Sequence, residues 1–319
     1  MSNKLKIIIL ALVAVVFALL FVFYNLNANS NLEYILPRRG TKVLAIIVTG
    51  AAIAFSTVVF QTITNNRILT PSIIGFDSLY LLIQTFLIFV FGSVSFFVVN
   101  KEFNFLLSVV IMIGFAGLFY YVLFKREGGQ NIYFLLLVGI VLGTFFTSIS
   151  TFMQVLIDPN EFLIVQDRMF ASFNNVNTDI LGISIILFVL VTIYFWKYMK
   201  YLDVLSLGKD AAVNLGVDYD HVVKRLLVVV AILVSISTAL VGPILFLGLL
   251  VANVTYEFLK THKHSYTITG AILVSVVALV SGQFIIERLF SFSVPISVII
   301  NFIGGVYFIF LLIRGNKSW

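Results

Sequence analysis

The chain has 319 residues, of which 61% are hydrophobic and 11% charged, and its formal net charge is +6. Because a soluble domain carries about 25% charged residues, this chain has too little polar surface to cover a water-soluble globule. The modest positive charge of so apolar a chain indicates a bias between loops rather than nucleic-acid binding, and the lack of cysteine excludes disulfides and thiolate metal sites.

Apolar runs long enough to cross a hydrocarbon core of roughly 30 Å follow one another along the chain. Their length favours helices, because barrel strands alternate over only about ten residues. The predicted spans are 5–25, 42–62, 78–99, 105–124, 131–155, 180–199, 224–242, 245–259, 268–287 and 294–313. We therefore expect an all-α integral membrane protein, with about ten transmembrane helices in a single domain over residues 1–319.

Basic residues are unevenly divided between the loops. If the N-terminus is cytoplasmic, fourteen Lys and Arg residues fall inside and six outside. Short cytoplasmic loops are enriched in Lys and Arg. The bias predicts that both termini are cytoplasmic, together with the loop of about 200–224 between the sixth and seventh spans.

Ionisable side chains are missing from the middle of the predicted spans. All fourteen acidic residues fall in loops or at span ends, and His221, His262 and His264 fall in loops. Proton- and ion-coupled carriers usually keep an ionisable residue near the membrane midplane, where its charge changes during coupling. The pattern disfavours a proton-driven carrier and a membrane-embedded enzyme, leaves Na⁺ coupling through backbone carbonyls open, and predicts no metal site.

Two spans carry polar side chains on one helical face. In 131–155 and 294–313, hydroxyl and amide side chains repeat at spacings of three and four residues. Such residues either line a wet path or let helices pack closely in lipid, and both interpretations stay open. The candidate path residues are Thr144, Thr147, Ser148, Thr151, Gln154, Ser297 and Asn301.

The segment "LSLGKDAAVNLGVDYDHVVK", residues 205–224, interrupts the apolar runs with charges, small side chains and two glycines. Ser206 is expected to cap a short helix, Gly216 to end it in a left-handed conformation, and Asp218 or Asp220 to cap the next helix. The apolar face is rich in alanine and lacks Trp and Phe, so it is poorly suited to lipid headgroups. We expect it to dock against another protein through Leu207, Gly208, Ala211, Ala212, Leu215 and Gly216.

Five stretches carry a family resemblance. They are "GAAIAFSTVVFQTITNN" (50–66), "LLLVGIVLG" (135–143), "LSLGKDAAVNLGV" (205–217), "GPILFLGLL" (242–250) and "ERLFSFSVPISVIINFIGG" (287–305). The third is similar to the pattern Leu-Gly-x-x-x-Ala-x-x-Leu-Gly-Val, and the fourth to Gly-Pro-Ile-x-Phe-x-Gly-Leu. Both patterns belong to the FecCD-type permeases of bacterial ABC importers for iron–siderophores, haem and cobalamin, which the chain resembles from about residue 39 to 313.

The resemblance implies a type II ABC importer permease in the bacterial plasma membrane, with no enzymatic activity of its own. It implies a second permease subunit, either a copy of this chain or a paralogue, with the substrate path between the two. It further implies two cytoplasmic ATPase subunits, which bind the ATP and Mg²⁺, and an external substrate-binding protein. The cargo would be an iron–siderophore complex, and the 205–224 segment would contact the ATPase.

The resemblance also locates gates at the cytoplasmic end of the path. These are Asn66 and Ile68, after the second span, and Asn131 and Ile132, at the start of the fifth.

On the outer face, the resemblance assigns docking of the binding protein to Arg39, Lys42 and Arg288, with Arg38 assisting. In the family such cations pair with acidic residues of the binding protein. The competing interpretation pairs them with lipid phosphates or with nearby Glu33 and Glu287.

The sequence departs from the family patterns in three places. The first proline of Asn-Pro-Leu-Ala-x-Pro is missing at 66–71, Pro-His-x-x-Arg is replaced at 252–256, and Arg-x-Pro-Arg is altered at 39–42. These departures suggest a divergent branch, for which we expect catecholate-type siderophores. The alternative function is a gradient-driven secondary transporter of a small solute, which would move its substrate without ATP.

Overall fold

The computed structural model describes residues 2–24, 32–125, 132–174, 176–290 and 294–315. All regular elements in these residues are helices, which confirms the predicted all-α class. Eight are long and apolar enough to cross a membrane. They are α1 (Asn3–Phe23), α2 (Leu32–Thr64), α5 (Lys101–Lys125), α6 (Ile132–Leu156), α8 (Thr178–Trp196), α11 (Tyr219–Val241), α13 (His264–Arg288) and α14 (Ile296–Gly315).

Two shorter apolar helices occupy the remaining predicted spans. They are α3 (Phe76–Phe91) and α12 (Leu247–Leu259). The count of ten transmembrane helices therefore depends on how these two sit in the membrane and stays a prediction. The connecting helices are η1 (Pro71–Ile74), α4 (Phe96–Val99), α7 (Pro159–Arg168), α9 (Met199–Leu205) and α10 (Lys209–Asn214).

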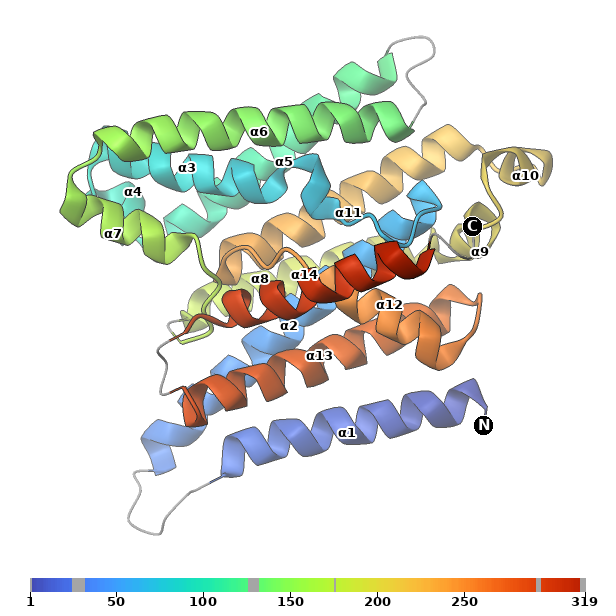
Figure 1. The fold of residues 1–319 in the computed structure, drawn as a ribbon, viewed down its shortest axis with the longest axis horizontal. Helices are drawn as coiled ribbons and strands as arrows, with labels where there is room; N and C mark the ends of the chain where they lie inside the picture. The colour runs from blue at the N-terminus through green and yellow to red at the C-terminus, as the bar shows by residue number, and fades with distance from the viewer. Residues whose placement is uncertain (1, 25–31, 126–131, 175, 291–293, 316–319) are drawn as a thin grey trace.

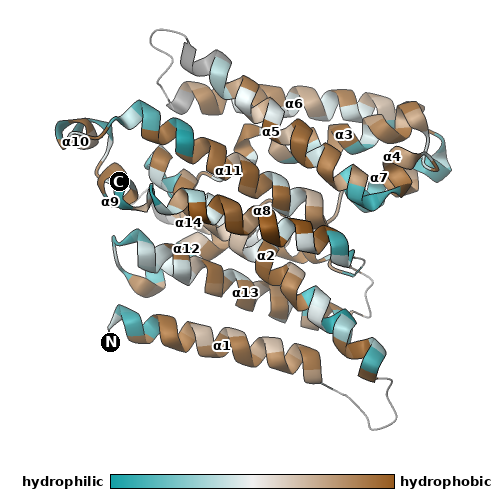
Figure 2. Cartoon of the chain, turned by 180° about the vertical axis from the view of Figure 1, so that it is seen from behind, coloured by the Kyte–Doolittle hydropathy of each residue, from teal (hydrophilic) through white to brown (hydrophobic). Residues whose placement is uncertain are grey.

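The long helices lie side by side, with α1 at one edge and α6 at the other (Figure 1). The centre is formed by α2 and α11, which pack against each other, and α2 also packs against α13. Close approach is possible because α2 carries small residues: a Cβ on Gly50 would lie 2.8 Å from Ser275 Oγ. Hydrophobic residues dominate the helix bodies and hydrophilic ones gather near the ends, as expected for a bundle that spans a membrane (Figure 2).

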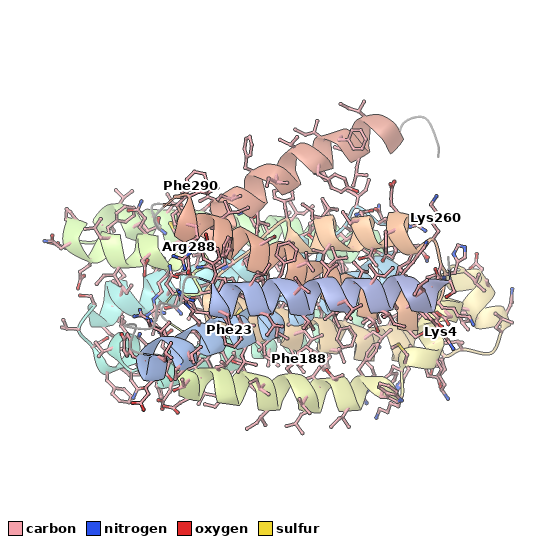
Figure 3. All side chains as sticks on the ribbon, turned by 90° about the horizontal axis from the view of Figure 1, so that it is seen from below. Lys4, Phe23, Phe188, Lys260, Arg288 and Phe290 are labelled. Atoms are coloured by element: carbon pink, nitrogen blue, oxygen red, sulfur yellow. The ribbon has the colours of Figure 1, made fainter. Side chains whose placement is uncertain are left out.

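Both chain ends lie at the same end of the bundle as α10 (Figure 1). Lys4 and Lys260 lie at that end, whereas Arg288 and Phe290 lie at the opposite one (Figure 3). This arrangement agrees with the predicted topology, in which termini and the 200–224 loop share one side. That this side is cytoplasmic remains a prediction from charge, and we call it the inner end.

Sequence reasoning predicted one continuous span over 78–99, whereas the structure divides it. The chain leaves the helix at Gly92, which has φ +80°, and α4 is a separate short helix. With 16 residues, α3 is about 24 Å long, less than the roughly 30 Å of a hydrocarbon core. Likewise α12 has 13 residues and follows a break after Gly242, where φ is +100°. Both helices also begin at buried residues, Phe76 and Leu247, so they start within the bundle.

The start of α3 is held against α6 by a close contact between glycines. Gly75 has φ +91°, and a Cβ there would lie 2.9 Å from the Cα of Gly143. We expect Gly75→Ala to lower the free energy of unfolding by about 2 kcal/mol or more, because strained backbone and a backbone clash add together. Thermal denaturation of the purified protein measures the effect. Gly117→Ala is the control, since a Cβ there meets nothing within 4 Å; equal melting temperatures for both variants would contradict this account.

Candidate functional site

Four of the predicted path residues line one hollow on the outside of this chain. Thr144, Thr147, Ser148 and Thr151 on α6 face Ser72, Gly75 and Ser78 of η1 and α3 across a hollow of about 700 Å³. Thr147 Oγ1 lies 3.1 Å from Ser78 Oγ, which ties the two walls together. The α6 residues are exposed, although large apolar side chains flank them.

The hydroxyls of this hollow are also bonded to their own helix. Thr144, Thr147 and Ser148 each donate to the carbonyl oxygen four residues earlier, at 2.9 Å. Their protons are therefore satisfied without water. The stripe can consequently face either a wet path or a closely packed partner, so the structure leaves both interpretations open.

The other predicted path residues lie elsewhere. Gln154 Nε2 donates to Ser150 Oγ at 3.0 Å and to Thr85 Oγ1 at 3.4 Å, inside the α3–α6 contact. Ser297 is buried and accepts from the backbone N–H of Ala171 at 3.0 Å. Asn301 accepts from the backbone N–H of Phe246 at 3.4 Å. The structure therefore does not bring these three side chains together with the hollow.

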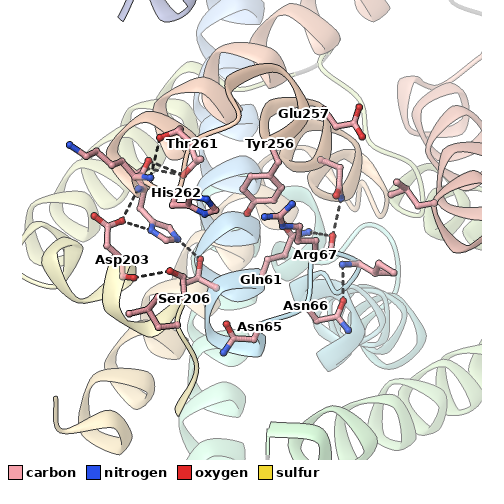
Figure 4. A pocket seen from close by; sticks show the side chains of 18 of the residues that line it. Gln61, Asn65, Asn66, Arg67, Asp203, Ser206, Tyr256, Glu257, Thr261 and His262 are labelled. Atoms are coloured by element: carbon pink, nitrogen blue, oxygen red, sulfur yellow. Dashed lines mark hydrogen bonds and ion pairs between the residues drawn. The ribbon is translucent and has the colours of Figure 1, made fainter. Parts of the chain in front are cut away.

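The candidate gate residues Asn66 and Ile68 line a pocket of about 860 Å³ at the inner end (Figure 4). The loop is well held: Arg67 O accepts from Gln61 Nε2 at 2.7 Å and Asn253 Nδ2 at 2.9 Å. The Arg67 guanidinium stacks over the Tyr256 ring at 4.9 Å. Of the other two gate residues, Asn131 and the Ile132 side chain lie outside the described residues.

A buried histidine links this loop to the predicted ATPase-docking segment. His264 begins α13, and its Nδ1 lies 2.6 Å from Asp203 Oδ1 on α9, which also accepts the His264 backbone N–H at 2.9 Å. The other ring nitrogen, Nε2, lies 2.8 Å from Thr62 Oγ1 in the last turn of α2. Sequence reasoning assigned His264 to a loop, but its side chain is buried. Its partners are distant in sequence, so no local pattern could reveal the link.

The docking segment differs in detail from the predicted helix. Its helix, α10, begins after Gly208 rather than at Ser206, whose hydroxyl donates instead to Asp203 O at 2.7 Å. The predicted left-handed Gly216 and the Asp218 cap of α11 are both present.

The side chains that the segment buries and exposes also differ from the prediction. Ala212 is fully buried in this chain's own core, and Ala211 is half-buried. Leu207, Val213 and Leu215 are the large apolar side chains that stay exposed, at 64%, 51% and 63%. We call these three residues the docking patch. Val213 was not among the predicted contact residues, because the sequence analysis expected the face of Ala211 and Ala212 to be the exposed one, whereas Ala212 packs against this chain.

Lys42 and Arg39, two of the four outer cations, bind groups of this same chain. Lys42 Nζ forms an ion pair with Glu287 at 2.7 Å and also donates to Asn174 Oδ1 at 3.1 Å. Arg39 Nη1 donates to the carbonyl oxygens of Val22 and Tyr24 at the end of α1, at 2.7 and 2.9 Å.

The remaining two outer cations are more exposed. Arg38 donates to Tyr34 OH at 3.1 Å, and Arg288 lies over the Tyr24 ring at 5.2 Å. For Lys42, the pairing with Glu287 corresponds to the competing interpretation raised from the sequence. Arg38 and Arg288 keep the more accessible charges for a partner.

One acidic residue is more buried than the sequence suggested. Asp77 lies at a helix end, as predicted, but this end is the buried start of α3, and the residue is only 7% exposed. Pro71 and Gly75 just before it were the local signal of a helix break. Among the described residues, no group of three or more His, Asp or Glu side chains is placed to hold a metal ion.

The comparisons with known proteins agree over nearly the whole chain. The model of the FecCD transport family matches residues 3–314. The chain is 61% identical over 319 residues to the petrobactin import system permease protein YclO of Bacillus subtilis, covering 100% of both chains. It is 40% identical over 280 residues to the petrobactin import system permease protein FatC of Bacillus anthracis, covering 88% of this chain and 79% of FatC.

A solved structure has the same fold. The chain superposes on a metal-chelate type ABC transporter in an inward-facing conformation with a TM-score of 0.84, covering 98% of this chain and 100% of the other, at 22% identity. This similarity concerns the fold alone. Together with the family match, it confirms the resemblance found in the sequence: the chain belongs to the FecCD transport family.

Proposed function

We propose that this chain is the transmembrane permease subunit of an ATP-driven ABC importer that carries a ferric siderophore of the petrobactin kind across the bacterial plasma membrane. The observation that carries this proposal is the full-length 61% identity to a petrobactin import permease. The expected catecholate-type cargo remains part of the proposal. A gradient-driven carrier is not favoured.

The surfaces of the chain suit the partners of such an importer. The polar hollow on α6 and α3 is open on one side, and we assign its missing wall to a second permease subunit, either a copy of this chain or a paralogue. The exposed docking patch at the inner end would receive the ATPase, which binds the ATP and Mg²⁺. Arg38 and Arg288, at the outer end, would meet the substrate-binding protein.

The geometry suggests how ATPase movement reaches the path. A force on α10 passes to α9, because the two helices pack together. From Asp203 on α9 it passes through the His264 ring to Thr62. Thr62 lies four residues before Asn66, so the last turn of α2 and the gate loop would move with the docking segment.

The deciding experiment uses proteoliposomes that hold the permease with its ATPase. Loaded with ATP and given ferric petrobactin with its binding protein, they should take up iron when ion gradients are collapsed. Uptake that requires an ion gradient and ignores ATP would overturn the proposal in favour of a secondary transporter. A catalytically dead ATPase provides the control.

Cysteine scanning separates the two interpretations of the polar stripe. We expect cysteines at 144, 147, 148 and 151 to react with a water-soluble thiol reagent, because these positions face the hollow. A cysteine at 154 should react at least about tenfold more slowly, since the native Gln154 side chain lies in the α3–α6 contact. No native cysteine interferes. Protection at all of the first four positions in the assembled transporter would favour packing.

Reversing the accessible outer charges tests docking of the binding protein. The double variant Arg38→Glu/Arg288→Glu should weaken binding by about tenfold and reverse its salt dependence, since like charges then face each other and rising ionic strength screens their repulsion. Surface plasmon resonance at several salt concentrations measures both effects.

Lys42 is the contrasting cation, because it is paired with Glu287 inside this chain. Lys42→Ala removes the partner of Glu287 and should lower stability by about 3 kcal/mol, because the carboxylate is left largely buried and unpaired.

Unchanged, salt-dependent binding by the Arg38→Glu/Arg288→Glu variant would show that these arginines are not the docking site.

A further inference from the structure

We propose that Asp77 anchors a buried site for one monovalent cation of the size of Na⁺, where α2, α3, α11 and the start of α12 meet. This site adjoins the polar hollow, with which it shares Ser72, and is separate from the docking surfaces.

The carboxyl group of Asp77 is only half satisfied by the protein. Thr238 Oγ1, in the last turn of α11, donates to Asp77 Oδ1 at 3.2 Å. The second oxygen, Oδ2, is buried and has no hydrogen-bond partner among the described residues. An unsatisfied carboxylate oxygen in a bundle interior is costly, so an additional bound species is expected there.

A small cavity lies beside this carboxyl group. Its volume is about 20 Å³, and one water-sized occupant needs at least about 10–15 Å³. Its polar lining is made of oxygen-bearing side chains, and no Lys, Arg or His lines it. The lining therefore offers no positive side chain to neutralise Asp77.

Three of the hydroxyls that line the cavity present lone pairs rather than protons. Ser56 donates its proton to Ile53 O at 3.0 Å, and Ser237 donates to Val234 O at 2.9 Å. Thr238 donates to Asp77 itself. A water molecule can donate only two hydrogen bonds, whereas a hard cation can be coordinated by all these oxygens at once. An acceptor lining of this kind favours a cation over water.

Charge balance sets the valence of that cation. One carboxylate is neutralised by one positive charge, whereas a divalent ion would leave an excess charge in a medium of low dielectric constant. In membrane proteins Na⁺ is held by unwound backbone carbonyls and by the C-terminal ends of broken helices, and here the C-terminal end of α11 contributes Ser237 and Thr238. Bound here, the ion would fasten the first turn of α3 to α2 and α11. Because Ser72 lines both this cavity and the hollow, it would also brace one wall of the hollow.

Thermal stability in different salts tests the site on the full-length permease, purified with its ATPase in lipid nanodiscs. At constant ionic strength, NaCl should raise the melting temperature of the permease above its value in choline chloride, and the shift should grow with Na⁺ concentration. Asp77→Asn should lose this shift, whereas Asp179→Asn, which changes an exposed carboxylate, should keep it.

Binding of ²²Na⁺ gives an independent measurement, with about one ion per permease chain expected and none in Asp77→Asn. If that variant fails to fold, Ser237→Ala and Thr238→Val should each weaken Na⁺ binding several-fold. Equal melting temperatures in Na⁺ and choline, or a Na⁺ shift that persists in Asp77→Asn, would overturn the proposal. So would an equal shift with K⁺, or a melting temperature that responds to pH but not to Na⁺, which would identify a bound proton.

Discussion

Val213→Glu should abolish assembly of this chain with its ATPase while leaving the permease folded. Val213 is exposed on α10, so a carboxylate there is solvated in the free chain. In the assembled transporter the same carboxylate would be buried against the partner without a counter-charge, at a cost of roughly 3 kcal/mol. That cost corresponds to a loss of affinity of more than about a hundredfold. Copurification of the two subunits and ATP-driven iron uptake should both disappear.

Two controls distinguish docking from folding. His262→Glu places the same charge on an exposed position outside the 205–224 segment and should leave assembly intact. Ala212→Glu buries the charge in the permease's own core, so it should lower the melting temperature of the isolated permease. A Val213→Glu permease that copurifies normally with its ATPase would show that α10 is not the docking helix.

The long helices could be predicted because hydropathy acts locally. The apolar run at 5–25 becomes α1 over Asn3–Phe23, and the run at 268–287 becomes α13 over His264–Arg288. Helix breaks were harder to predict. The run at 78–99 is apolar throughout, yet Gly92 ends α3 because its positive φ takes the chain out of the helix. A hydropathy value averaged over many residues does not detect a helix break caused by a single residue.

The residues of the candidate site were likewise predictable only where the signal is local. The stripe at Thr144, Thr147, Ser148 and Thr151 could be found from spacing, because helical periodicity fixes which residues share a face. Gln154 continues that spacing, but its long side chain bends into the α3–α6 contact. The links between distant elements, such as Lys42 with Glu287, follow from tertiary packing, and no spacing within one segment encodes them.

His264→Asn and His264→Gln should each uncouple ATP hydrolysis from import. An Asn side chain can still donate to Asp203 in place of Nδ1, but it is too short to reach Thr62. A Gln side chain can replace the Nε2 contact with Thr62, but it loses the side-chain contact with Asp203 and keeps only the backbone N–H bond to that carboxylate. If the ring transmits force from α9 to α2, both halves of the link are needed, and each variant should hydrolyse at least about five times more ATP per imported iron.

The ratio of ATP hydrolysed to iron imported is the informative measurement, because a purely structural defect lowers both rates together and leaves the ratio unchanged. His262→Asn is the matched control, since His262 lies two residues away and its side chain is exposed. Thr62→Ser keeps the hydroxyl and should behave like the native protein, whereas Thr62→Val has nearly the same shape without the hydroxyl and should uncouple. If Thr62→Val and both His264 variants retain the native ratio, the Asp203–His264–Thr62 contacts only stabilise the fold, and force reaches the gate loop by another route.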